Sequence, residues 1–293
     1  AQNGKDVTVL VELQARFDEE NNIKFANLLS DEGITVLFGY RGLKVHSKVC
    51  YISRREDNKL VGYAHVGTGN FHESTAKIYG DLSLLTRNVE ITNEVRRMFE
   101  LLEGNFTPYH YKHLLVSPLN MRTQLVRMIN QEIRNAQIGK NAFIHLKLNN
   151  IIDPDLMDKI YQASQAGVQV KLNIRGICGI RPGIKNLSEN IEAISILGKY
   201  LEHTRIMIFC NNDEPKYFIG SADWMERNLD RRIEVTCPIY DKDIQKELRF
   251  IFDLQWSDNV KARQIDGNSK NEYRKTDKKA NTRAQMEFYK YYS

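Results

Sequence analysis

The first part of the chain alternates short apolar runs with an amphipathic stretch. Residues 7–13 and 34–38 are runs rich in valine and leucine, and the apolar positions between them recur with helical spacing. Asp18 can cap this helix at its start, and Gly33 is typical of a helix C-terminus. A strand, a helix and a strand in this order predict two parallel strands joined by a crossover helix.

The same plan returns in the second part of the chain. Residues 142–148 form an apolar run, Asp153 precedes a proline at the first position of a helical pattern, and this pattern ends at Gly167. Residues 168–174 then supply the second strand. An internal repeat on this scale predicts two related halves.

The repeat extends to charged residues. In LKVHSKVCYI, His46 and Lys48 are two residues apart, and in LEHTRIMIF, His203 and Arg205 have the same spacing. Because side chains alternate along a strand, we expect each histidine and its cation on one face of one strand.

Each of these pairs is followed by a strand that ends in a turn of small, polar residues. The turns are GTGN at 67–70 and GSAD at 220–223. The second half also has an insertion before its histidine, RGICGIRPGI, which carries Arg175 and Arg181. We therefore predict that each half contributes one half of a shared site.

Further helices are predicted outside the repeats. Residues 92–104 and 120–139 have amphipathic patterns between the two copies, and residues 241–256 have one after the second copy. The predicted boundary gives a first domain of residues 1–112, truncated at its start, and a second of residues 113–293 with a charged tail. The tail fits either a docked terminal helix or a disordered segment.

The charge is unevenly distributed along the chain. The 293 residues carry a net charge of +5, but residues 261–293 hold nine basic and four acidic residues, so the rest is neutral. This balance disfavours a general polyanion-binding protein. With 27% charged and 42% hydrophobic residues, wholesale disorder is excluded as well.

The apolar runs, the start of the sequence and the cysteines indicate the cellular compartment of the protein. No apolar run reaches the roughly 18 residues of a membrane span, and no signal peptide is visible. The missing initiator methionine and the early strand indicate a fragment. Cys50, Cys178, Cys210 and Cys237 have neither CxxC nor zinc-site spacing, so we expect reduced core cysteines in a cytoplasmic protein.

A histidine with a cation, found twice, suits phosphate chemistry. A neutral imidazole can attack phosphorus and a second one can protonate a leaving oxygen. Lys48 and Arg205 would neutralise the phosphoryl oxygens, and the small turns, with Asn70, would add hydrogen-bond donors. The alternative is a partly buried structural histidine; the duplication favours a functional role for His46 and His203.

Nucleotide binding would need residues other than a P-loop, because no Walker A sequence occurs. Arg16, Arg175 and Arg181 lie in predicted loops just after strand runs, where α/β sheets bind ligands. Tyr79 could stack on a base. The alternatives are surface ion pairs for the arginines and a place at the core edge for Tyr79. His65 could face either the site or the sheet interior.

These residues lie in strings that resemble one branch of the phospholipase D superfamily. VELQARFDEENNIKFANLL, GLKVHSKVCYI, YAHVGTGNFHESTAKIYGDLSLLT, NIRGICGIRPGI and SADWMERNLDRRIEV are similar to the carboxy-terminal half of bacterial polyphosphate kinase, over residues 6–265. The resemblance implies an α/β fold of two tandem phospholipase D-like domains, each a mixed sheet flanked by helices. It also implies reversible transfer of the terminal phosphate of ATP to inorganic polyphosphate through a phosphohistidine.

The resemblance assigns roles to single residues. It makes His46 the phosphorylated histidine and His203 the second catalytic histidine, and it places nucleotide contacts on Tyr79, Arg175 and His203. It associates Arg16 with the magnesium site. A guanidinium has no lone pair, so Arg16 would contact the Mg²⁺-bound phosphates and not the metal.

The resemblance also implies partners and leaves alternatives. We expect Mg²⁺, ATP or ADP and polyphosphate, no nucleic acid, and a homo-oligomeric full-length protein in the cytoplasm or peripherally at a membrane. One alternative is a phospholipase D-like phosphodiesterase or phosphatidyltransferase, disfavoured because VCYISRRE lacks the aspartate of that motif. Another is a non-catalytic polyanion-binding module. Family members have amino-terminal domains that this chain lacks, which leaves open whether the fragment alone is active.

Overall fold

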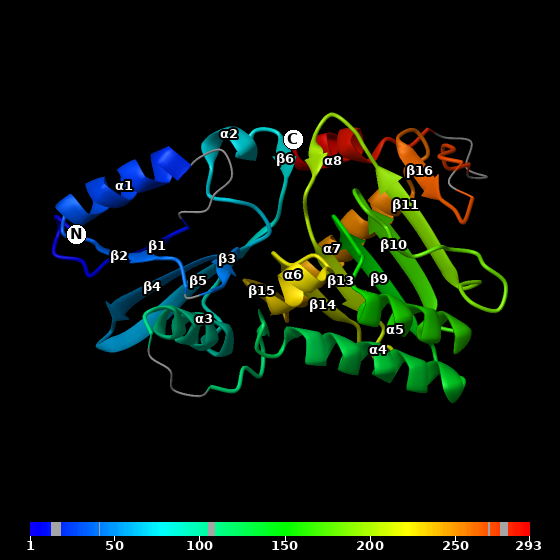
Figure 1. Cartoon of the computed structure of the whole chain (residues 1–293), viewed down its shortest axis with the longest axis horizontal. Helices are drawn as coiled ribbons and strands as arrows, with labels where there is room; N and C mark the ends of the chain where they lie inside the picture. Colours follow the sequence, from blue (N-terminus) through cyan, green and yellow to red (C-terminus); the bar gives the residue numbers. More distant parts are fainter. Residues whose placement is uncertain (13–18, 41, 105–108, 269, 276–280) are drawn as a thin grey trace.

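The computed structural model describes residues 1–12, 19–40, 42–104, 109–268, 270–275 and 281–293. Two halves lie side by side, with β1 to β7 and α1 to α3 in one and β8 to β16 and α4 to α8 in the other (Figure 1). The first half consists of β1 (Thr8–Val11), α1 (Glu19–Asp31), β2 (Thr35–Phe38), β3 (Lys44–Val45), β4 (Lys48–Glu56), β5 (Lys59–Gly67), α2 (Glu73–Ala76), β6 (Tyr79–Gly80), β7 (Ser83–Thr86) and α3 (Val89–Leu102).

The second half is larger. It consists of β8 (Leu115–Ser117), α4 (Met121–Gln137), β9 (Phe143–Leu148), α5 (Pro154–Gln165), β10 (Gln169–Ile174), β11 (Ile191–Ile196), β12 (Leu201–Glu202), β13 (Ile206–Phe209), β14 (Lys216–Gly220), α6 (Glu226–Asp230), β15 (Arg232–Ile239), α7 (Lys242–Trp256), β16 (Ala262–Ile265) and α8 (Ala284–Tyr292).

Both predicted strand–helix–strand units are present. β1 pairs in parallel with β2, and β9 pairs in parallel with β10. The side chain of Asp153 accepts a hydrogen bond from the backbone N–H of Leu156 and so caps α5. Gly33 and Gly167, just beyond α1 and α5, have φ angles of 76° and 98°, a conformation that glycine adopts without strain. The period of the apolar residues therefore predicted these units correctly.

A mixed nine-stranded sheet forms the centre of the second half. Its order is β16-β11-β10-β9-β13-β14-β15-β3, and β8 pairs with β15. Helices α4 and α5 cover one face and α7 covers the other. Along β13, Met207 and Phe209 pack with α4 and α5, whereas Ile206 and Ile208 pack with α7. The predicted α/β class, with mixed sheets flanked by helices, is confirmed.

The two halves share a hydrophobic core. Val95 and Met98 of α3 pack in one cluster with Leu114 and with Ile233 and Val235 of β15. The first half adds a three-stranded sheet, β4-β5-β7, to this cluster, and β1 with β2 forms a separate pair. Since a single core spans both halves, they pack as one unit; the division at residue 112 stays a prediction.

Short strands of the two halves pair with each other at two places. β3 of the first half pairs in parallel with β15 of the second, and β6 of the first half pairs in parallel with β12 of the second. In the first pair Val45 lies opposite Ile233, and in the second pair Glu202 lies opposite Gly80. These two crossings place equivalent parts of the two halves next to each other.

The prediction of one continuous strand through each histidine and its cation is wrong. β3 ends at Val45 and β4 begins at Lys48, and in the second half β12 ends at Glu202 and β13 begins at Ile206. The chain breaks here because the residues before each histidine pair with the opposite half and those after it pair within their own half.

The structure also tests the expectations for the cysteines, the tail and membrane-spanning helices. Cys210 and Cys237 are buried and all four thiols are free, but Cys50 is exposed, so the expectation of a core position is wrong for it. Its neighbours Val49 and Tyr51 face the core, and alternation turns Cys50 outward. The tail ends in the docked helix α8. Among the described residues, no helix is both long and apolar enough to cross a bilayer.

Candidate active site

His46 lies at the crossing between β3 and β15. Its backbone N–H donates to the carbonyl oxygen of Ile233, and its Nδ1 lies 2.9 Å from the carboxylate of Glu234. The Glu234 side chain is fully buried, whereas that of His46 is 24% exposed. An ionised carboxylate only accepts hydrogen bonds, so Nδ1 carries the proton and Nε2 is the basic nitrogen.

His203 lies at the other crossing, between β12 and β6, in the same geometry. Its backbone N–H donates to the carbonyl oxygen of Gly80, and its Nδ1 lies 2.8 Å from Oδ1 of Asp81. In each case the carboxylate directly follows the residue that accepts from the backbone of the histidine. Each histidine is therefore held by a carboxylate from the opposite half.

The small-residue turns hold these two carboxylates. Thr68 donates from its hydroxyl to Asp81 at 2.6 Å, and Ser221 donates to Glu234 at 2.5 Å. The same hydroxyls accept the backbone N–H of the residue after each carboxylate, Leu82 in one half and Val235 in the other. The GTGN and GSAD turns thus orient the acids, a role that the sequence did not predict.

The cations occupy matching positions. Lys48 donates to the carbonyl oxygen of His46, and Arg205 donates to that of His203 at 2.7 Å. Arg205 also reaches the carbonyl oxygen of Thr68 in the first half, at 3.3 Å, and the carboxylate of Asp223, at 3.2 Å. The charge of Lys48 acts on Glu234 and on the acid of the other pair. The cations therefore lie between the two histidine–carboxylate pairs.

The two imidazoles differ at Nε2. His203 Nε2 lies 3.1 Å from a guanidinium nitrogen of Arg205, which can donate to it. For His46 Nε2, the described part of the chain provides no hydrogen-bond partner. His46 therefore presents a free lone pair, which a nucleophile requires.

The electrostatic environment keeps the imidazoles neutral. Burial lowers the pKa of His46, and the attraction of Glu234 offsets this only in part. Burial likewise lowers the pKa of His203, against its hydrogen bond to Asp81. For Glu234, burial favours protonation, but the contacts with His46 and Lys48 outweigh it and lower the pKa. Neutral imidazoles beside ionised carboxylates follow.

Lys48 has an unusual environment for an ammonium group. It is 6% exposed, and burial lowers its pKa to about 7. Glu234 raises this pKa, while Arg205 and Arg232 lower it. Near neutral pH the side chain can thus be charged or neutral, and a bound anion would favour the charged form.

Two buried donors at the site lack an acceptor. Nε of Arg205 and Nδ2 of Asn149 are shielded from solvent and make no hydrogen bond with the described residues. A buried donor without a partner costs about 1–3 kcal/mol. Phosphate oxygens could accept from both, so these donors are consistent with an anion-binding site.

The nucleotide candidates divide into two groups. Tyr79 lies beside His203, with ring centroids 5.1 Å apart, and the charge of Arg175 interacts with Arg205 and Asp223. The structure thus brings Tyr79 and Arg175 to the histidines. Arg175 is anchored by a bond from its Nε to Oδ1 of Asn149, at 3.0 Å.

The other candidates are placed elsewhere. Arg181 donates to the carbonyl oxygen of Gly267 at 3.0 Å, and among the described residues it makes no hydrogen bond with the site. Asn70 is exposed at the end of its turn. His65 lies in β5, and its ring is tilted against that of Phe71, with centroids 5.0 Å apart. Arg16 lies outside the described residues.

A buried network supports the strand before His203. Glu202 forms an ion pair with Lys147 at 2.9 Å and accepts hydrogen bonds from Gln255 and Gln285. Gln285 belongs to α8. The docked tail helix therefore helps to hold the strand that directly precedes His203.

Sequence reasoning missed the acids of the site. Asp81, Asp223 and Glu234 were quoted only within longer strings, although each binds a predicted site residue. A usable signal existed, since Asp81 and Glu234 are single acidic residues followed by apolar ones in YGDLSLL and RRIEV. Their partners could not be read from spacing, because each pair joins opposite halves.

The site acids leave little room for a metal held by protein alone. Asp81, Glu234 and Asp223 are engaged with His203, His46 and Arg205, respectively. Within the described ranges, no group of three or more His, Cys, Asp or Glu side chains could hold a metal ion. The residues present suit a cation that is carried by phosphate oxygens.

Comparison with known proteins gives consistent matches. Residues 114–285 match the family model of polyphosphate kinase C-terminal domain 2, and residues 1–108 match that of C-terminal domain 1. Curated polyphosphate kinases from Vibrio vulnificus (strain CMCP6) and Escherichia coli (strain K12) are 50% and 49% identical over 99% of this chain. The chain spans 41% and 42% of their lengths.

A solved structure is similar throughout. The polyphosphate kinase from Porphyromonas gingivalis covers 100% of this chain with a TM-score of 0.92 and 39% identity. The match takes up 45% of that protein. The similarity therefore includes the whole described fold and less than half of the relative.

We predict that Lys48→Met makes stability less dependent on pH. The folded chain binds the Lys48 proton only below a pKa of about 7, whereas the ordinary value in the unfolded chain is 10.5. Wild-type stability should thus rise with pH between these values, by about 1 kcal/mol per pH unit from this group. The variant's advantage should be greatest at pH 7 and shrink toward pH 9.5, measured by urea unfolding.

The matched control for this test is Lys59→Met, at an exposed position in the β4–β5 hairpin. It should keep a constant difference from wild type across the same pH range. If the Lys48→Met difference is constant too, the ammonium group is not perturbed by burial.

We predict that Gly69→Ala disrupts the second histidine pair. A Cβ at Gly69 would lie 2.1 Å from Oδ2 of Asp81, so the carboxylate must leave Thr68 and His203. We expect a loss of about 2 kcal/mol in the free energy of unfolding and a changed His203 imidazole NMR signal. Gly80→Ala is the control, because its Cβ would meet only the Leu201 carbonyl oxygen, at 3.6 Å. Equal effects of both variants would contradict this steric explanation.

Proposed function

This chain belongs to the polyphosphate kinase family, and on that basis we propose that it carries the phosphate-transfer site of an ATP:polyphosphate phosphotransferase. The reaction is reversible transfer of the terminal phosphate of ATP to inorganic polyphosphate through a phosphohistidine. Because the chain spans less than half of its curated relatives, the activity is proposed for the whole protein.

The crossed histidine–carboxylate pairs are the observation that carries the proposal. Each imidazole is oriented through Nδ1 by an acid of the opposite half, and Nε2 of His46 has no hydrogen-bond partner in the described part of the chain. This is the geometry of an oriented nucleophile with a second imidazole from the other half. The buried cations Lys48 and Arg205 supply the charge that phosphoryl transfer needs.

The transfer step follows from these positions. Nε2 of His46 attacks the terminal phosphorus of ATP, a P–N bond forms, the bridging P–O bond breaks, and ADP leaves with the bond electrons. Glu234 holds the Nδ1 proton and stabilises the positive charge on the ring. A terminal oxygen of polyphosphate then attacks the phosphohistidine and releases neutral His46.

The second histidine handles the oxygen that leaves or attacks. His203 in its protonated form can donate to a leaving oxygen, and in its neutral form it can accept a proton. This role requires Nε2 to exchange its contact with Arg205 for the substrate. Release of the guanidinium would in turn let Arg205 bind the phosphoryl oxygens.

The nucleotide and its cation complete the proposal. Arg175 would bind phosphate and Tyr79 would contact the base, since both lie near His203. Mg²⁺ would neutralise the phosphates to which it is bound, with Arg16 contacting those phosphates. Arg181 and Asn70 have less support from the structure. A homo-oligomer acting in the cytoplasm, without nucleic acid, is proposed on the resemblance alone.

We predict that His46→Ala in the full-length protein abolishes both phosphate labelling and polyphosphate synthesis. Without the nucleophile, label from γ-³²P-ATP should fall by at least about a thousandfold. The bond should be labile in acid and stable in base, as expected for a P–N bond. His203→Ala should slow transfer by a factor of about a hundred or more while the fold is kept.

His65→Ala is the control for these two variants, because His65 lies in the same half as His46 but has no carboxylate partner among the described residues. It should retain label. Peptide mapping that finds label on His65, with His46 unmodified, would overturn the assignment.

We predict that Arg175→Met weakens ATP and ADP binding by about tenfold or more, which exceeds the effect of a surface ion pair. Arg181→Met is the matched control in the same insertion, since its guanidinium binds the Gly267 carbonyl oxygen. Equilibrium binding to the full-length protein measures both. Weaker binding in the Arg181 variant alone would place the nucleotide elsewhere.

A further inference from the structure

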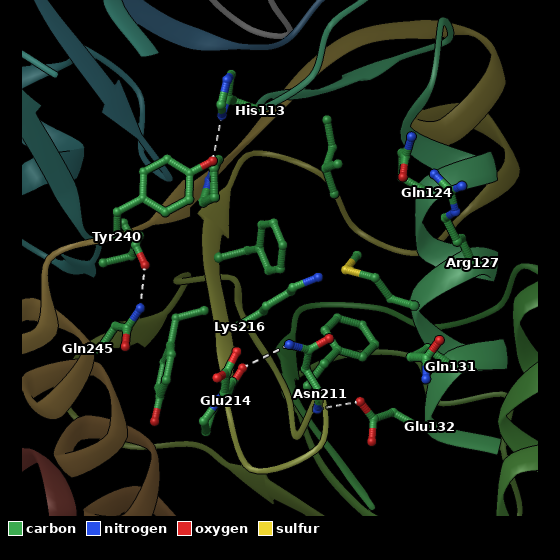
Figure 2. A pocket seen from close by; sticks show the side chains of 18 of the residues that line it. His113, Gln124, Arg127, Gln131, Glu132, Asn211, Glu214, Lys216, Tyr240 and Gln245 are labelled. Carbon is green, nitrogen blue, oxygen red and sulfur yellow. Dashed lines mark hydrogen bonds between the residues drawn. The ribbon is translucent and has the colours of Figure 1, made fainter. Parts of the chain in front are cut away.

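A hollow lies at the opposite end of the sheet from the histidines. It has a volume of about 580 Å³ and is bordered by α4 and by the ends of β13, β14 and β15 (Figure 2). Phe209 and Phe218 form part of its lining and are only 1% and 5% exposed. We call this hollow the α4 groove.

Five lysine and arginine side chains line the α4 groove. One of them, Arg134 of α4, donates to the side chain of Gln131 at 2.7 Å. The other four come from different segments, and they are Lys112 before β8, Arg127 on α4, Lys216 on β14 and Lys242 at the start of α7. Lys216 reaches in between Tyr240 and Arg127 (Figure 2). None of the four forms an ion pair with a described residue.

The acids of the groove do not balance these cations. Glu132 is buried and accepts the backbone N–H of Asn211 at 2.6 Å, and burial raises the pKa of its carboxyl. Glu214 is exposed. Another basic side chain, His113, forms a hydrogen bond with Tyr240 at 2.7 Å. The chain outside the tail is neutral on average, yet this groove is positive.

The groove and the histidine site share two strands. β14 begins at Lys216 in the groove and leads to Ser221 at the site. β15 runs in the opposite direction, with Glu234 near its start and Ile239 at its end in the groove. Five residues of strand span about 17 Å. A ligand the size of a single triphosphate is therefore too short to contact both places.

We propose that the α4 groove is a second binding site for inorganic polyphosphate, which holds a distant part of the polymer whose end reacts at the histidines. This inference rests on the proposed function. Cations distributed around a groove suit a polymer that carries a negative charge on every unit. Phe209 and Phe218 are nearly buried, and the more exposed ring of Tyr240 is paired edge-on with His113. A second contact would raise the affinity for long chains through effective concentration.

The test compares two double variants of this chain that remove the same charge. The groove variant is Arg127→Gln with Lys216→Met; the control is Arg55→Gln with Lys59→Met, exposed positions in the β4–β5 hairpin. Binding of long-chain polyphosphate, tripolyphosphate and ATP is measured at several salt concentrations. The groove variant should bind long chains about tenfold more weakly than the control, with a salt slope lower by about 2.

Tripolyphosphate and ATP should bind equally to both variants, because they are too short to reach the groove from the histidines. Long-chain binding that is equal in the two variants would overturn the proposal, and so would a loss confined to ATP, which would indicate a nucleotide site. Lys112→Met with Lys242→Met repeats the test from the other walls of the groove. If the full-length protein forms no phosphohistidine but still binds long-chain polyphosphate at the groove, the proposed transfer mechanism is wrong. The assignment of the groove as a polyphosphate site would then still hold.

Discussion

The burial of the Glu234 carboxylate constrains the rest of this structure. A carboxylate without access to water stays ionised only if donors surround it, and Glu234 has three, from His46, Ser221 and Asn228. These donors belong to three different segments. The register of β3 on β15, the turn after β14 and the short helix α6 must therefore all be correct at once. Since His46 belongs to the other half, separation of the two halves would remove one of these three donors.

Much of this arrangement could be predicted from local patterns, and the remainder depends on contacts distant in sequence. The strand–helix–strand units follow from apolar periodicity, and the duplicated histidine and cation locate His46 and His203. The continuous strand was wrong because pairing with the opposite half interrupts it. The acids Asp81 and Glu234 lie 122 and 188 residues from their histidines, which no spacing rule connects. Arg175 and Arg181 looked equivalent in the sequence and are separated only by their contacts with Asn149 and Gly267.

A buried polar network supports the segment before the second histidine. Beneath it, Glu202 is bound by Lys147, Gln255 and Gln285, which come from the sheet, from α7 and from the terminal helix. A network of this kind adds little net stability but fixes one geometry, because each member loses its partner if another moves. The tail, which the sequence left undecided, is thus part of the support for His203.

The crossed strands also have a consequence for how the two copies can diverge. Two identical chains related by a twofold axis must carry the same residue at both equivalent positions, so neither imidazole could be changed without the other. Joining the copies on one chain removes that constraint. Lysine at 48 can face arginine at 205, glutamate at 234 can replace aspartate at 81, and one imidazole can lose its guanidinium contact while the other keeps it. A single chain can therefore give two equivalent histidines different surroundings.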